Sequence, residues 1–312
     1  MGTQSQQDER ASPMATATTT PANEKRLQMG WLLIHPMAAS WILVPGLSPF
    51  VTMSAISLSL YTLIKLHVLT HYAASGNPVS PLDTLAWFFA WPGLDARAFF
   101  RRRDVNAPTM NEVLFAVAKV GFGGGVLFLV APAFRVDSEL ASGWAALIGI
   151  IFLLHFGTFH LAALFWRNRG RDVKPIMNAP ILARSVSEFW SRRWNLAFRD
   201  YASPFLFVPL MRKTNSAVAV LAGYTFSGLV HEIAISVPAR GGYGLPTLYF
   251  AIQGAAMLIE RSAEKRGIGL TSGILGWCWT AIVTVPGAYI LFPPVFVRTV
   301  VLPVVDFVAG LS

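Results

Sequence analysis

Several segments of about 20 predominantly apolar residues run through this chain, and no other feature restricts its fold as strongly. A segment of that length can cross the hydrocarbon core of a bilayer as a helix. Because lipid offers the backbone no hydrogen-bond partners, such segments form helices rather than open strands. We therefore expect an all-α, polytopic helical membrane protein with about eight transmembrane helices plus interfacial or re-entrant helices. The expected spans cover approximately residues 29–44, 49–70, 111–130, 144–166, 216–237, 245–259, 268–291 and 292–309.

The composition supports this class of protein. Charged residues make up 13% of the chain and hydrophobic residues 54%, with a mean hydropathy of +0.51. Soluble domains carry roughly 25% charged residues, so most of this chain cannot face water. Residues 1–27 are polar and rich in Thr, Ala and Ser, which predicts a disordered tail. One membrane-embedded domain, residues 28–312, is expected to follow it.

The net charge of +9 is explained by membrane orientation rather than by nucleic acid binding. Most of the 25 Lys and Arg residues lie in the tail and in the segments 73–109, 167–213 and 261–266, which alternate with pairs of spans. The opposite loops hold only Arg135 and Arg240. Since basic loops stay in the cytoplasm, the N-terminus is expected there, in a bacterial inner membrane or in the endoplasmic reticulum of a eukaryote. The surrounding partners would be membrane lipids, and no pattern indicates an oligomeric state.

The most unusual stretch follows residue 186 and mixes aromatic with polar side chains. Read as one helix, Glu188, Arg192, Asn195 and Arg199 would share a single face. Aromatic side chains would cover most of the remainder: Phe189, Trp190, Trp194, Phe198 and Tyr201. An aromatic helix with a narrow polar stripe is suited to the headgroup layer of a membrane.

A lone histidine, His231, ends the apolar run that begins at residue 217. An ionisable group in such a run is costly unless it has a partner or a function. A neutral imidazole can remove a proton from a hydroxyl, and an amide such as that of Asn195 can stabilise charge on a carbonyl oxygen. These residue types support direct group transfer onto a hydroxyl. No Gly-x-Ser-x-Gly segment is present, so an acyl-serine enzyme is not indicated.

Two other classes remain open from the residues alone. In a transporter or channel, His231, Glu232 and Lys119 would form a proton or ion path. In a purely structural membrane protein, Asn195 would only cap or break a helix, and His231 would form a hydrogen bond with a neighbouring span. No metal site is expected, since the helical pair His67 and His71 has no third ligand nearby.

Two patterns inside the expected spans concern packing. Lys65 lies near the end of its span and is expected to extend its amine to the lipid headgroups. Four glycines, Gly121 and Gly123 to Gly125, fall within five positions of another span. They predict close helix packing or a cavity wall.

Residues 189–195 (Phe-Trp-Ser-Arg-Arg-Trp-Asn), followed by residues 227–232 (Ser-Gly-Leu-Val-His-Glu), resemble the wax synthase-like branch of the membrane-bound O-acyltransferase family. Residues 85–95 and 241–250 resemble the same branch, so the similarity covers about residues 80–260. The resemblance implies a helical body enclosing a catalytic chamber, with acyl-CoA entering from the cytosolic side as co-substrate and no bound cofactor. The acceptor would be the hydroxyl of a long-chain alcohol or other lipid.

The same resemblance implies the site residues. His231 is the expected general base and Asn195 the second residue of the catalytic motif. The phosphates of acyl-CoA need cationic partners, and arginine binds phosphate through two parallel hydrogen bonds. Together with Arg103, some of the arginines expected on the cytosolic side would meet them. The complete expected substrate-binding set is Trp190, Arg192, Arg193, Trp194, Glu232, Arg101 and Arg102.

Overall fold

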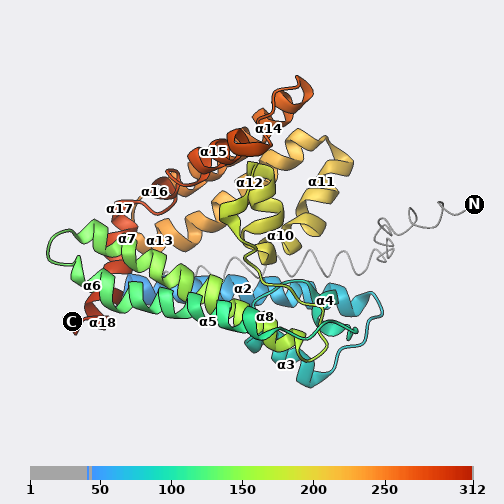
Figure 1. Cartoon of the computed structure of the whole chain (residues 1–312), viewed down its shortest axis with the longest axis horizontal. Coiled ribbons are helices and arrows are strands. Elements are labelled where there is room, and N and C mark those ends of the chain that lie inside the picture. Colours follow the sequence, from blue (N-terminus) through green and yellow to red (C-terminus); the bar gives the residue numbers. More distant parts are fainter. Residues whose placement is uncertain (1–40, 42–43, 311–312) are drawn as a thin grey trace, which may run out of the picture.

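The computed structural model describes residue 41 and residues 44–310, and every regular element in that part of the chain is a helix (Figure 1). The expected tail and most of the expected first span lie outside the described residues. Five described helices are long and apolar enough to cross a membrane. They are Pro49–Ala74, Met110–Ala133, Glu139–Arg167, Ser216–Ala239 and Gly273–Leu291. The all-α membrane architecture is therefore confirmed.

Most of these spans are built from consecutive pieces, several with π-helical turns, which are frequent at functional sites. The first is the single helix α2 (Pro49–Ala74). The second joins α5 (Met110–Gly125), η2 (Val126–Val130) and α6 (Ala131–Ala133), and the third joins α7 (Glu139–Ile150), η3 (Ile151–Thr158) and α8 (Phe159–Arg167). The fourth joins α12 (Ser216–His231), η7 (Glu232–Ser236) and α13 (Val237–Ala239), and the fifth contains α15 (Gly273–Thr284) and α16 (Ala288–Leu291).

The remaining helices are shorter or more polar. Residues 73–109, which lie between the second and third expected spans, contain α3 (Pro81–Ala90) and α4 (Ala96–Phe100). The expected sixth span is α14 (Leu245–Lys265), which continues through Glu260, where a charged loop was expected. The expected eighth span is divided into α17 (Pro294–Phe296), η8 (Val297–Val301) and α18 (Leu302–Val308). Neither of these two segments is among the five long apolar helices.

Glycine allows two of the spans to approach closely, as the glycine pattern predicted. A Cβ at Gly123 of α5 would overlap the backbone of Leu153, and one at Gly149 would lie 2.8 Å from the nitrogen of Leu127. Both helices thus present glycine where their backbones meet, the arrangement that favours helix association in lipid. Gly121 and Gly125 face open space, so only part of the glycine run serves this packing.

Lys65 does not extend to the headgroups, which corrects the expectation from its position. Its side chain is fully buried, and its amine donates to the carbonyl oxygens of Trp87 and Trp91 at the end of α3. The amine also lies 4.2 Å from the centroid of the Trp87 ring. The carbonyls at the end of a helix lack hydrogen-bond partners within the helix. The buried amine of Lys65 supplies those partners at the end of α3, and the adjacent ring face adds a cation–π contact.

Candidate active site

The segment expected to form one helix is interrupted at Trp194 and Asn195, so the single-helix interpretation is wrong. Helix α9 (Val186–Glu188) continues as η5 (Phe189–Arg193), and a new helix, α10 (Leu196–Ala202), starts after the break. Trp194 is extended, and Asn195 is left-handed with φ 43° and ψ 59°. Asparagine tolerates this region better than most residues, and its side chain caps the new helix by accepting from the Phe198 amide at 3.4 Å.

Two buried residues of α14 hold this segment in place, and neither is among the site residues expected from the sequence. The Glu260 carboxylate accepts from the backbone amides of Val186 at 2.5 Å and Ser187 at 3.1 Å. The Gln253 side chain accepts from the Trp190 indole at 3.1 Å. Both acceptors are almost fully buried, at 1% and 0% exposure. The available signal was an ionisable residue and an amide seven residues apart, and therefore on the same face of a helix that begins with an expected span.

His231 ends α12 and faces the same region. Its Nδ1 lies 2.7 Å from the Ser227 carbonyl oxygen, which can only accept a hydrogen bond. The neutral imidazole therefore carries its proton on Nδ1, and Nε2 is left as an acceptor. The Phe250 ring lies against the imidazole, with centroids 4.5 Å apart, and fixes its position from α14.

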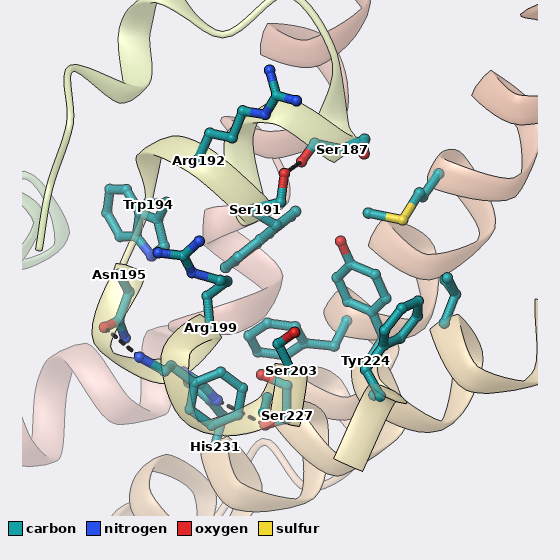
Figure 2. A pocket seen from close by; sticks show the side chains of 18 of the residues that line it. Ser187, Ser191, Arg192, Trp194, Asn195, Arg199, Ser203, Tyr224, Ser227 and His231 are labelled. Atoms are coloured by element: carbon teal, nitrogen blue, oxygen red, sulfur yellow. Dashed lines mark hydrogen bonds between the residues drawn. The ribbon is translucent and has the colours of Figure 1, made fainter. Parts of the chain in front are cut away.

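A cavity of about 510 Å³ brings His231 and Asn195 together. Figure 2 shows the two side chains on the same side of this space, with Arg192 and Ser187 at the opposite end. Trp190, Arg192 and Trp194 from the expected binding set also line it. The other lining residues include several apolar side chains, among them Phe198, Phe207, Val220 and Met257. The cavity therefore combines an apolar wall with a few polar groups, as ligand sites commonly do.

Three arginines give the cavity a positive wall. Arg199 is paired with Asp200 at 2.6 Å, whereas the guanidinium groups of Arg192 and Arg261 form no hydrogen bond or ion pair with another described residue. Burial, together with the nearby Asp95 carboxylate, raises the pKa of Asp200 to about 7, although the Arg199 guanidinium opposes this. Arg192 and Arg261 are consequently the described cations of the cavity that remain open to an anionic ligand.

Four residues of the expected binding set do not line the cavity. Arg193 pairs with Glu188 at 2.6 Å and supports the loop before it. Arg101 donates to the Asn77 side chain, and Arg102 pairs its backbone with Arg171. The Glu232 carboxylate accepts from the amides of Gly244 and Thr247, where it caps the start of α14. The positions of these four residues in the sequence do not indicate the partners that they find in the folded chain.

No group of three His, Cys, Asp or Glu residues in the described part of the chain could hold a metal ion. The Nδ1 of His67 instead lies 3.2 Å from the Tyr201 hydroxyl, and its ring packs against that of Phe205 with centroids 4.6 Å apart.

Apolar helices around a partly polar cavity define an integral, polytopic membrane protein. Residues 173–252, which include both Asn195 and His231, match the model of the membrane bound O-acyl transferase family. The resemblance to that family is therefore confirmed.

Known relatives agree with this match. The chain is 28% identical over 224 residues to a long-chain-alcohol O-fatty-acyltransferase of Simmondsia chinensis, covering 66% of this chain and 61% of that protein. It is 33% identical over 125 residues to probable long-chain-alcohol O-fatty-acyltransferase 3 of Arabidopsis thaliana, covering 37% and 35%. It is also 29% identical over 102 residues to acyl-CoA–sterol O-acyltransferase 1 of Arabidopsis thaliana, covering 30% of each. The matched segments thus span at most 61% of these relatives' lengths.

Proposed function

We propose that this protein transfers an acyl group from acyl-CoA to the hydroxyl of a long-chain alcohol or another lipid. The observation that carries the proposal is a cavity that His231, Asn195 and two open arginines line together. The names of the relatives support the reaction class and its alcohol or sterol acceptors. A wax ester would be the product with a long-chain alcohol.

In the proposed mechanism His231 acts as the general base. Nε2 takes the proton of the acceptor hydroxyl while the hydroxyl oxygen attacks the thioester carbonyl. The imidazolium formed in this way then gives the proton to the departing CoA sulfur. The Nδ1 hydrogen bond to the Ser227 carbonyl holds the tautomer that this step needs. The Asn195 amide donates to the carbonyl oxygen as negative charge develops on it.

The open arginines supply the donor site in this proposal. Arg192 and Arg261 come from η5 and α14, and both line the cavity. Since arginine binds phosphate bidentately, they are matched to the phosphates of CoA. This replaces Arg101, Arg102 and Arg193 of the expected set, whose groups are outside the cavity.

The transporter alternative loses its proposed ion path. Lys119 lies 3.1 Å from His160 on α8, not beside His231. Glu232 caps α14 rather than facing the cavity. Apart from three arginines and the phenol of Tyr224, the described residues that line the cavity offer His231 no further ionisable side chain for an ion path.

The test uses purified protein in lipid nanodiscs with labelled acyl-CoA, with and without a long-chain alcohol. Labelled ester should form only when both substrates are present. His231→Gln should lose about 10²-fold or more of turnover, since a positioned base contributes that much. His160→Gln, another span histidine outside the cavity, is the matched control and should stay active. Normal turnover of His231→Gln with an unchanged pH profile would remove the base assignment.

The donor site can be tested separately with Arg261→Gln. Loss of a charged phosphate partner should raise the KM for acyl-CoA about ten-fold and leave the KM for the alcohol unchanged. Lys265→Gln, exposed on the same helix, serves as the control. If Arg261→Gln and Lys265→Gln had the same KM for acyl-CoA, Arg261 would not bind the CoA phosphates.

A further inference from the structure

Tyr224 belongs to the cavity wall but has no part in the mechanism above. It lies on the face of α12 that also carries Val220, Ser227 and His231, all of which line the cavity. Tyr224 precedes His231 by seven residues, which places it about 10 Å further along the helix axis. In Figure 2 its side chain extends from α12 toward the end of the cavity that holds Ser191 and Arg192.

The hydroxyl of Tyr224 is buried and has no hydrogen-bond partner within the described residues. Two other phenols of the bundle are paired: Tyr249 donates to the Thr284 carbonyl at 3.4 Å and the partly buried Tyr61 to the Trp91 carbonyl at 3.2 Å. Nearly all buried polar groups in folded proteins are satisfied, so an unpaired hydroxyl in a cavity wall indicates a missing partner. Five other buried side-chain atoms of the described residues are also unpaired, but Tyr224 is the one of the six that lines the cavity, where a ligand would supply its partner.

The neighbouring helix fixes where Tyr224 lies between the two ends of the site. Helix α14 contacts α12 with Phe250 against His231 and Gly254 against the Tyr224 ring, where a Cβ would lie 3.2 Å away. Arg261 follows two helical turns after Gly254 and lines the cavity as well. Along the cavity, the order is therefore Arg261, Tyr224 and His231.

We propose that the Tyr224 hydroxyl donates a hydrogen bond to an amide carbonyl of the pantetheine arm of the acyl donor. The inference rests on the proposed function, in which the phosphates lie at Arg192 and Arg261 and the thioester lies at His231. The part of a CoA thioester between those two groups is the pantetheine arm, which carries two amides. A phenol hydroxyl donates to an amide carbonyl with ordinary hydrogen-bond geometry.

Tyr224→Phe tests this assignment because it removes only the unpaired hydroxyl. The KM for acyl-CoA should rise about five-fold, the size of one neutral hydrogen bond, while the KM for the alcohol stays unchanged. The thermal midpoint should not fall, since no bond within the protein is lost. Tyr249→Phe is the matched control: it should lower the thermal midpoint and leave the donor KM unchanged.

Two further measurements separate the possible failures. With an S-ethyl acyl thioester, which lacks the pantetheine amides, Tyr224→Phe and the natural protein should react equally. Binding of a non-reactive S-alkyl-CoA thioether, followed by calorimetry, should weaken about five-fold in Tyr224→Phe even without turnover. A raised alcohol KM, or unchanged thioether binding, would overturn the assignment. Absence of ester formation by the natural protein, with thioether binding weakened as expected, would instead overturn only the proposed transfer reaction.

Discussion

Asn195 has two properties that the sequence could not separate, a side chain that reaches the cavity and a left-handed backbone. Its φ of 43° costs most residues energy but is accepted by asparagine and glycine. An alanine substitution would change both properties at once. Glycine keeps the backbone conformation and removes only the amide.

We therefore predict that Asn195→Gly stays folded but loses turnover about 10²-fold, because the amide is needed at the developing oxyanion. The thermal midpoint should change little, since glycine at a helix start costs a few tenths of a kcal/mol relative to asparagine. Ala179 has the same φ of 43° outside the cavity, so Ala179→Gly is the control with unchanged turnover. An active Asn195→Gly variant would show that the residue only breaks the helix.

Asp200 makes stability depend on pH. In the unfolded chain its carboxyl ionises near 3.8, whereas burial in the folded protein raises its pKa to about 7. Between these values the folded state binds the extra proton, so the free energy of unfolding decreases as pH rises. The thermal midpoint in detergent should thus fall as pH rises from about 4 to about 7. Asp200→Asn should flatten this slope, and the exposed Asp104→Asn should keep it; equal slopes would refute the assignment.

At the level of elements, the sequence predicted most of the helices and two of the cavity's central residues. The length of the apolar segments alone predicted α2, α5 to α8, α12 and α15. The motifs at residues 189–195 and 227–232 indicated Asn195 and His231 as site residues. The break at residues 194–195 was not predictable from spacing, because its hydrogen bonds come from a distant loop. The Asn178 amide donates to the Arg193 carbonyl and the Leu196 amide to the Ile176 carbonyl, both at 2.8 Å. These two hydrogen bonds replace the i to i−4 hydrogen bonds of a continuous helix, and they form only once the chain has folded.

Glu260 joins three elements, and we predict that Glu260→Gln destabilises the protein by about 3 kcal/mol. Its carboxylate accepts from two amides at the start of α9 and from the Trp279 indole on α15 at 3.0 Å. In a glutamine, the NH2 group replaces one of the two carboxylate oxygens. It cannot accept a hydrogen bond, so at least one of the three N–H groups would lose its partner. The measurement is thermal unfolding in detergent. Glu264→Gln, exposed on the same helix, should remain within about 0.5 kcal/mol of the natural protein; equal losses would contradict the anchoring role.

For the whole molecule, the distribution of basic residues predicts that the loop after α8 faces the cytosol and the link before α14 faces the other side. Single cysteines at Asn168 and Tyr243 in a Cys278→Ser background should react with a membrane-impermeant thiol reagent from opposite faces. Tyr243 is 62% exposed and suits the second position better than Gly242, whose φ of 75° and contact with Pro293 exclude a side chain. Labelling of both sites from one face would refute this orientation.

The buried Lys65 also has a consequence for how the chain is made. During synthesis α2 leaves the ribosome before α3, so its lysine reaches the translocon without the carbonyls of Trp87 and Trp91 that later receive its amine. A lysine at the centre of a lone helix costs roughly 3 kcal/mol on insertion, and Lys65, which lies nearer the end of α2, costs part of that. Helix α2 should accordingly remain at the translocon until α3 has emerged, and the two should leave it for the lipid as one unit.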